Sequence, residues 1–315
     1  MSESQRPVSS SQIGSTIYKE ETIMATGQAT NRTNIDLPVD VSQEIIQKTQ
    51  DASAIMQLAR QIPLPGRGVA INVISGDPEA AWVAETAAKP VSNPALATKV
   101  MRGYKLAVIV PFSKEFERDA QALYGAIVQR LPGALAKKFD QTVFGAVEKP
   151  GSDFDDFTAI TAQALGSDAY SALVAADTDI AIHSGLTNGY VISPQMKGIL
   201  LGEKDEDGRP LFINSVSEGA IPMILGSKTV ATKAAIVPGS PSVVGFGGDW
   251  TQAMYGIVED VEITRSEEAT LDLGGGRTIN LFQQNMFAIR AEIEVGFRAD
   301  TSVFNAFTAS GVPTL

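Results

Sequence analysis

The chain contains no cysteine and a single histidine, His183. The absence of cysteine excludes disulfide bonds, a thiolate nucleophile, cysteine-ligated zinc and cysteine-held iron–sulfur clusters. A single histidine excludes metal sites built from several histidines and leaves a Ser-His-Asp triad only one base to use. Composition therefore removes several familiar metal and nucleophile chemistries.

Basic residues are outnumbered, with 25 Lys and Arg against 36 Asp and Glu and a formal net charge of -11. A protein that binds nucleic acid gains most of its affinity from Lys and Arg, so this balance argues against that function. A shell can still enclose nucleic acid without binding it tightly. Long apolar runs are also missing. The longest ones, such as Leu106–Val110, fall far short of the ~18 residues of a membrane span. We expect no membrane helix, no secretory signal in residues 1–34, and synthesis in a cytoplasm.

The length and a hydrophobic fraction of 44% predict a globular chain with two lobes or one large domain. Residues 1 to about 37 are the exception, because they are rich in Ser, Thr, Gln, Asn and Gly with scattered apolar side chains. Such a segment buries too little surface to fold alone, so we predict an N-terminal arm. Within it, Met24 is an alternative translation start to Met1.

Two segments of the first half carry clear periodicities. Apolar residues at helical spacing follow Asp40, and the prolines that begin at Pro63 predict that this amphipathic helix stops by Ile62. The β-branched runs Val69–Ile74 and Leu106–Val110 predict a long two-stranded ribbon. Because such a ribbon is marginal alone in water, we expect it to lie on another surface, of the same chain or of a neighbour.

The longest helical region is predicted to begin after Ser113, which can cap it, and to be kinked or broken at Pro132. In the C-terminal part, Phe287–Phe297 alternates between an apolar and a charged face and is the clearest strand. Gly274–Gly276 most simply supplies the turn of a hairpin. Helices and short strands alternate between these regions without a regular βαβ repeat, so the predicted fold class is α+β. The predicted short strands are Tyr190–Ile192, Ile221–Leu225 and Val243–Phe246.

Four local motifs suggest chemistry but fail on spacing. Gly226–Thr229 lacks the earlier glycine of a phosphate-binding loop, and Gly274–Gly276 lacks the spacing of a dinucleotide-binding loop. The stretch Asp205–Gly208 lacks the remaining ligands of a calcium loop. Asp177–His183 brings two aspartates near the histidine in sequence, which does not assemble a triad. The residues therefore predict no small-molecule active site, no metal site and no cofactor.

The order of these parts resembles the major capsid proteins of tailed phages that share the Hong Kong 97-type fold. That order is a polar arm, a short helix, a long β-ribbon, a long spine-like helix, a mixed lobe and a return to strands with a charged face. The resemblance covers essentially Asp40–Phe307. Its most specific pieces, in chain order, are Ala81–Glu85, Lys89–Ser92, Phe112–Glu115 and Asn285–Glu292.

The resemblance implies the Hong Kong 97-type fold with an N-terminal arm, an extended β-ribbon loop, a peripheral domain with a long spine helix, and an axial domain. The arm and short helix would span residues 1–65, the extended loop 66–111, the peripheral domain 112–176, the axial domain 177–244, and the return strands of the peripheral domain 245–315.

The resemblance also implies a function: self-assembly as hexamers and pentamers into the icosahedral shell of a double-stranded DNA phage. The expected partners are further copies of the chain, a portal protein, a decoration protein and a separate scaffolding protein, since about forty N-terminal residues cannot house a scaffolding domain. The DNA would be enclosed without sequence-specific binding, and no membrane would take part. The expected location is the virion capsid, assembled in the host cytoplasm.

Covalent cross-linking is the sharpest chemistry that the resemblance implies. In cross-linking family members a ribbon lysine attacks an asparagine of a neighbouring peripheral domain, a glutamate assists, and an isopeptide bond forms as ammonia leaves. Lys89, Asn285 and Glu292 lie at the matching positions. The lysine must be neutral to attack, so the closed interface would have to desolvate it while the carboxylate accepts the proton. The alternative is an exposed or ion-paired Lys89 and a Glu292 that belongs to a ladder of charges with Arg290, Glu294 and Arg298.

Two other classes of protein stay open on the sequence. The same fold family includes encapsulin compartments, so an encapsulin-like shell would enclose a protein cargo instead of DNA. An acidic cytoplasmic enzyme with a carboxylate-based site would be a small oligomer that binds a defined ligand. Apart from the cross-linking step, the sequence predicts no enzyme.

Overall fold

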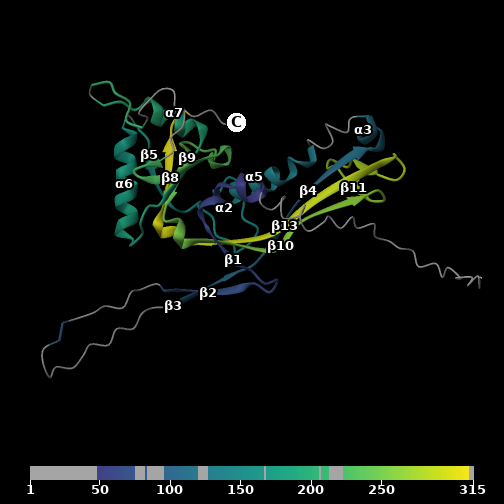
Figure 1. Ribbon diagram of the computed structural model, residues 1–315, viewed down its shortest axis with the longest axis horizontal. Helices are drawn as coiled ribbons and strands as arrows, with labels where there is room; N and C mark the ends of the chain where they lie inside the picture. The colour runs from purple at the N-terminus through teal and green to yellow at the C-terminus, as the bar shows by residue number, and fades with distance from the viewer. Residues whose placement is uncertain are drawn as a thin grey trace, which may run out of the picture. The chain divides into compact units, whose positions relative to one another are not determined.

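The computed structural model describes residues 48–74, 82–83, 96–119, 127–166, 168–205, 207–212 and 223–311, all within one structural unit, Asn34–Leu315. Helices and strands both occur along this part of the chain, which confirms the predicted α+β class (Figure 1). Two larger sheets organise it, one of four strands and one of six. No helix among these residues is long and apolar enough to cross a membrane.

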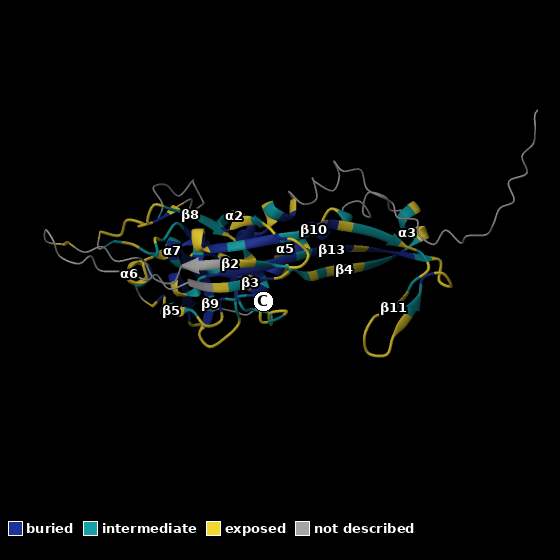
Figure 2. Cartoon of the chain, turned by 90° about the horizontal axis from the view of Figure 1, so that it is seen from below, coloured by how far each residue is buried: buried dark blue, intermediate teal, exposed yellow. Residues whose placement is uncertain are grey.

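The four-stranded sheet is built around two long antiparallel strands, β10 (Ala253–Ser266) and β13 (Met286–Ala299). On the far side of β13 lies the antiparallel strand β4 (Tyr104–Ser113), and the short strand β1 (Arg60–Pro63) pairs in parallel with the outer edge of β10. The predicted C-terminal strand is thus confirmed as a central strand. Figure 2 shows that β13 is largely buried, because β4 and β10 flank it and other elements cover its faces, whereas most described residues of β10 are partly buried or exposed.

The six-stranded sheet has the strand order β5-β14-β9-β6-β8-β7. The strands predicted at Tyr190–Ile192 and Val243–Phe246 are confirmed as β6 and β9, and the described part of Ile221–Leu225 contains β7. Helices α6 (Ala169–Ile182) and α7 (Pro194–Gly202) pack against this sheet. The strands are β5 (Thr161–Ala164), β6 (Gly189–Ile192), β7 (Met223–Ile224), β8 (Ser227–Ala231), β9 (Ser242–Gly248) and β14 (Phe304–Ala309).

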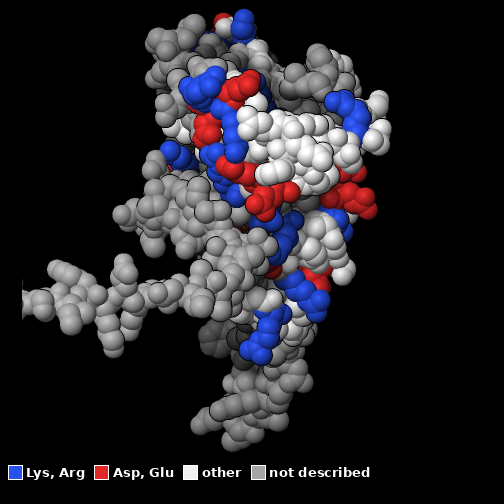
Figure 3. Space-filling model, turned by 90° about the vertical axis from the view of Figure 1, so that its right-hand side faces the viewer, with Lys and Arg blue, Asp and Glu red and all other residues white. Residues whose placement is uncertain are grey.

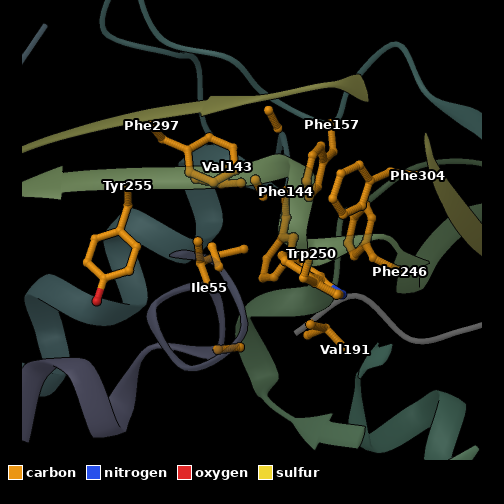
Figure 4. Close-up of a cluster of buried hydrophobic side chains, with 14 of the residues drawn as sticks. Ile55, Val143, Phe144, Phe157, Val191, Phe246, Trp250, Tyr255, Phe297 and Phe304 are labelled. Atoms are coloured by element: carbon orange, nitrogen blue, oxygen red, sulfur yellow. The ribbon is translucent and has the colours of Figure 1, made fainter. Parts of the chain in front are cut away.

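An aromatic core joins the two sheets (Figure 4). The ring of Phe157 stacks on Phe304 of β14 with centroids 4.7 Å apart, and it meets Phe297 of β13 edge-on at 6.0 Å. Phe144 stacks on Phe246 of β9 at 4.6 Å. Each such ring buries a large apolar area and adds a favourable ring–ring geometry. Both sheets are therefore held together by one shared core.

Among the described residues, the predicted long helical region contains α3 (Lys114–Asp119), a helical stretch at residues 127–128 and α5 (Leu131–Val143). The cap is confirmed, because the Ser113 hydroxyl accepts a hydrogen bond from Phe116 N at 3.1 Å. The break at the proline is confirmed as well: Pro132 lies in the first turn of α5, where its missing N–H costs no helical hydrogen bond. Helix α5 then packs against β4 and β13.

The prediction that one helix runs from Asp40 to Ile62 is wrong at its end. Residues 40–47 lie outside the described residues, and residues 48–52 are helical. A second helix, α2 (Ala54–Leu58), then begins at Ser53, whose hydroxyl caps it, and residues 60–63 form β1 instead of continuing the helix. Backbone pairing with β10 gives these residues hydrogen-bond partners that the last turn of a helix lacks.

The ribbon is confirmed at its base, but its second strand differs from the prediction. Strand β2 (Val69–Ile74) pairs antiparallel with β3 (Leu96–Met101), whereas Leu106–Val110 belongs to β4 in the four-stranded sheet. Gly103 makes the change of direction possible, because a Cβ there would lie 2.5 Å from the Val258 side chain. Beyond this point the apolar face of β4 gains burial against the core of the sheet.

The predicted glycine hairpin is confirmed. Strands β11 (Thr270–Asp272) and β12 (Thr278–Asn280) pair antiparallel, and Gly274–Gly276 take φ values of +81°, +64° and +76°, which favour glycine. The loop of this hairpin is exposed in Figure 2. Three short 3-10 helices complete the elements, namely η1 (Lys233–Ala235), η2 (Trp250–Gln252) and η3 (Thr301–Val303).

Candidate functional site

The structure places two of the three candidate cross-linking residues. Lys89 lies outside the described residues. Asn285 is exposed in the turn directly before β13 with φ +53°, and Glu292 lies in the middle of that strand. Seven residues of extended chain separate them by roughly 23 Å. One chain therefore does not bring Asn285 and Glu292 together, and any shared site has to combine different copies.

Glu292 is part of a set of ion pairs on the four-stranded sheet. Its carboxylate lies 3.2 Å from Arg290 Nε on the same strand and 3.9 Å from Lys105 Nζ on β4, and its side chain is 17% exposed. The alternative of a charge ladder thus describes Glu292 within one chain, although Arg298 has other partners. The two cations balance a half-buried carboxylate that would otherwise be costly to desolvate.

Arg298, near the end of β13, holds the base of the ribbon. Its Nε donates to the Val100 carbonyl on β3 at 2.7 Å. Its Nη1 donates to Asp155 Oδ1 at 2.8 Å, and its Nη2 donates to Asp153 Oδ1 at 3.2 Å. The rigid fork of a guanidinium suits this task, because it can bond several acceptors in fixed directions. One side chain therefore ties together β13, the ribbon and the segment around Asp153.

Two basic residues of the ribbon region complete this arrangement. Lys99 Nζ donates to a backbone carbonyl of β13 at 2.9 Å and lies 3.7 Å from Asp155 Oδ2. Arg102 Nε lies 3.3 Å from Asp153 Oδ2. Each carboxylate faces two cations, because Arg298 is shared between Asp153 and Asp155. We call this group the ribbon anchor; it consists of Lys99, Arg102, Asp153, Asp155 and Arg298.

A buried carboxylate ties the N-terminal helices to α5. Asp140 is fully buried, and its two oxygens accept hydrogen bonds from the Ser53 hydroxyl at 2.5 Å and from Ala54 N at 2.8 Å. Burial raises the pKa of Asp140 to about 6, while these hydrogen bonds and one from Ile55 N oppose the rise. Asp140 therefore also serves the free N–H groups at the start of α2.

A second charged cluster fixes α3 to the end of β10. Arg265 makes two hydrogen bonds to the Glu117 carboxylate, at 2.7 and 3.1 Å, and a third to Glu267 at 3.0 Å. These bonds raise the pKa of the Arg265 guanidinium, and Lys114 and Arg265 lower the pKa of the Glu267 carboxyl. The guanidinium also lies 3.9 Å from the ring centre of Phe287. Figure 3, which faces this end of the molecule, shows basic and acidic side chains next to each other around an uncharged area.

The rejected phosphate and calcium motifs have local structural roles. Leu225 and Gly226, with φ +47° and +79°, form the turn between β7 and β8. Asp205 Oδ1 accepts a hydrogen bond from Arg209 N at 2.6 Å within an exposed turn. Both segments thus use their polar and glycine residues to shape turns.

The single histidine also has a local role. His183 follows α6, and its Nδ1 lies 2.8 Å from the Asp179 carbonyl oxygen. The Asp179 carboxylate in turn accepts a hydrogen bond from Asn305 Nδ2 at 2.9 Å. Among the residues that the structure describes, no group of three or more acidic or histidine side chains is arranged to hold a metal ion.

Sequence reasoning missed the ribbon anchor and Asp140. A signal existed for Asp140, because it follows Ala136 by four residues and so lies on the apolar face of the predicted helix. A charge at such a position needs buried partners. For Arg298 no comparable signal existed, since Asp153 and Asp155 lie more than 140 positions away in the chain.

Comparisons with known proteins agree with this architecture. A model of the phage capsid family matches residues 35–307. The probable major capsid protein gp17 of Mycobacterium phage L5 is 27% identical over 84% of this chain and 86% of its own length. The major capsid protein of Staphylococcus phage 80alpha is 24% identical over 82% of this chain and 81% of its own.

Solved structures show the same fold. A chain from Gordonia phage Cozz superposes with a TM-score of 0.69 at 21% identity and covers 82% of this chain and 87% of its own. A chain from the capsid of a native GTA particle gives a TM-score of 0.59 at 16% identity and covers 95% of this chain and 100% of its own.

Proposed function

The chain belongs to the phage capsid family and is a major capsid protein, and we propose that its copies assemble as hexamers and pentamers into the icosahedral shell of a tailed phage around double-stranded DNA. Its curated relatives are named as capsid proteins, so it is a structural protein and not an enzyme. The acidic-enzyme alternative loses its support, and the protein forms part of the virion.

One observation carries the proposal for assembly. The ribbon base β2–β3 pairs with no other strand among the described residues, yet the ribbon anchor fixes its direction with five charged side chains. A two-stranded ribbon is too weak to persist alone. A ribbon that is held firmly at its base is suited to reach a neighbouring copy and to gain its missing burial there.

The domain division is part of the same proposal. We assign the Hong Kong 97-type fold, with residues 1–65 as arm and short helix, 66–111 as extended loop, 112–176 and 245–315 as peripheral domain, and 177–244 as axial domain. The pairing of β4 with β13 supports a close link between the end of the extended loop and the return strands of the peripheral domain.

The remaining partners follow from the same assembly. A separate scaffolding protein would guide the copies, a portal protein would occupy one vertex, and a decoration protein would bind outside. Assembly would take place in the host cytoplasm. The negative net charge of -11 supports a shell that surrounds DNA without binding it tightly.

Electron microscopy of the expressed chain, alone and with a co-expressed scaffolding protein, tests this function. We expect rings, closed shells or tubes. Discrete small particles under both conditions would contradict it. The contents of the shells would separate a capsid, which holds DNA, from an encapsulin-like compartment, which holds protein.

Cross-linking is a second proposal. Lys89 Nζ of one copy would attack the side-chain carbonyl carbon of Asn285 in a neighbour, forming an amide bond and releasing ammonia, with Glu292 of another copy as the proton acceptor. The exposure of Asn285 supports this step, because a neighbour can reach its side chain. The ion pairs of Glu292 oppose it, since they occupy the carboxylate.

Denaturing gel electrophoresis of mature shells tests the cross-link. We expect ladders from the wild type that disappear in Lys89→Ala and in Asn285→Asp. Gln284→Glu is the matched control, because it changes the exposed neighbouring amide and should keep the ladders. A single monomer band from wild-type mature shells would rule the cross-link out.

A further inference from the structure

Helix α6 carries apolar side chains on the face that points away from its sheet. Ile182 is 74% exposed, and Leu186, just after the helix, is 77% exposed. Both side chains are large enough to bury substantial apolar area in an interface. Tyr170 and Val174 extend the same face at 46% and 40% exposure. Large apolar side chains that lie together on an exposed face, next to polar residues such as Asp177, mark a site of interaction with another surface. We call these four residues the α6 patch.

A second apolar patch lies at the opposite edge of the same six-stranded sheet. Helix α6 packs near β5, β14 and β9, whereas β7 is the last strand at the other end of the strand order. There, Met223 and Leu225 are 58% and 43% exposed in the β7–β8 hairpin. We call these two residues the β7 patch. One lobe thus presents two separate apolar surfaces.

The charges around the two patches are opposite in sign. Residues 168–182 contain three aspartates, two of them exposed, and no Lys or Arg. Residues 223–235 contain two exposed lysines, Lys228 and Lys233, and no Asp or Glu. Surfaces of this kind repel copies of themselves and attract each other. Complementary charge and apolar area therefore point to a contact between the α6 patch and the β7 patch of different copies.

We propose that the α6 patch of one copy docks on the β7 patch of the next copy, and that repetition of this contact closes a ring. A head-to-tail contact between different surfaces generates rings when its rotation closes. The proposal rests on the proposed shell function and deepens it by naming the surfaces that hold one ring of subunits together. The occupant of each patch is thus a second copy of this chain.

Charge reversal at single exposed positions tests this contact. Ile182→Lys would place a cation opposite Lys228 and Lys233 of the neighbour, and Met223→Glu would place an anion opposite the aspartates of α6. Because like charges that face each other across an interface repel, each single variant should raise the apparent dissociation constant of rings about tenfold or more. The double variant, which restores a Lys–Glu pair at every contact, should recover most of the assembly.

Native mass spectrometry and electron microscopy of the full chain would count rings. Leu273→Lys is the matched control, because Leu273 is 47% exposed on the β11–β12 hairpin and lies outside both patches. It should leave ring formation unchanged. Circular dichroism of each variant checks that the fold is intact, as expected for exposed positions.

Three outcomes would overturn the proposal. Rings from both single variants at wild-type levels would show that the patches do not meet. Rescue of Ile182→Lys by mixing with Ile182→Glu chains, without rescue in the double variant, would show that α6 pairs with α6. A wild-type chain that forms no ring or shell, even with a scaffolding protein, would overturn the proposed function as well, which separates the two failures.

Discussion

The aromatic core and the ribbon anchor are held by different forces. In the core, rings such as Phe157 and Phe246 pack with no charged partner, and burial of apolar area stabilises them. At the ribbon anchor, Arg298 and its partners make directional hydrogen bonds and ion pairs instead. Burial of apolar area therefore holds the body of the protein together, whereas charge-assisted bonds set the direction of the ribbon, which has too little surface to bury.

The largest expected effect is in the core. Phe157→Ala removes a buried ring that contacts both sheets, so the free energy of unfolding should fall by about 4 kcal/mol. Urea unfolding of the unassembled chain measures this. Phe282→Ala is the matched control, because that ring is 77% exposed, and its effect should be small. Equal losses in both variants would contradict the importance of the core.

The next effect is at the ribbon anchor. Arg298→Ala leaves Asp153 and Asp155 with fewer cations in a largely buried place, which should cost about 3 kcal/mol and loosen the ribbon base. Hydrogen exchange should rise in β2 and β3 but not in β14. Arg290→Ala, at a 44% exposed arginine of the same strand, should leave the ribbon protected. Unchanged exchange in Arg298→Ala would show that the ribbon is held by other contacts.

The buried carboxyl group of Asp140 makes the free energy of unfolding depend on pH. Because the pKa of Asp140 is higher in the folded chain than its ordinary 3.8, the folded state keeps this proton where the unfolded state has lost it. The contribution of this proton to the free energy of unfolding is complete below about pH 4 and is lost as the pH rises through about 6. It amounts to at most about 3 kcal/mol.

Unfolding of wild type and Asp140→Asn from pH 4 to pH 8 measures this slope. The wild type should lose stability as the pH rises, and the variant should lack that part of the slope, whatever its overall stability. Identical slopes in the two proteins would mean that Asp140 does not titrate in this range.

The smallest effect is expected on the exposed side of the four-stranded sheet. Lys105 is 64% exposed and lies 3.9 Å from Glu292, so Lys105→Ala should change the free energy of unfolding by only about 0.5 kcal/mol. Raising the salt concentration should shrink this difference further. A loss as large as that of Arg298→Ala would show that exposed charges also hold this sheet.

The sequence predicted elements whose signal is local. The alternation along Phe287–Phe297, the glycine triplet and the serine cap at Ser113 each depend on residues close in the chain, and each is confirmed. Prediction from the sequence failed where residues distant in the chain determine the secondary structure. Residues 60–63 form a strand because β10 lies beside them, and Leu106–Val110 leaves the ribbon because β13 offers more burial.

The candidate site shows the same limit. Local motifs located Asn285 and Glu292, but their surroundings depend on pairing across the sheet, so the two ion pairs of Glu292 were only one of the alternatives. The ribbon anchor could not be predicted, because its basic and acidic members come from three distant segments. Contacts between copies are harder still to predict from the sequence, since no single chain contains them.

The pairing of β1 with β10 has a mechanical consequence. Its four parallel pairs, from Arg60 with Met254 to Pro63 with Ile257, would be loaded together in shear by tension on the N-terminal side of the chain. Ahead of them along the chain, the bonds of Asp140 to Ser53 and Ala54 would take up the pull first. Tension on the N-terminal side of the chain is thus transmitted to α5 and then to β10. Because the two sheets share one core, strain from neighbouring subunits can be distributed over both sheets.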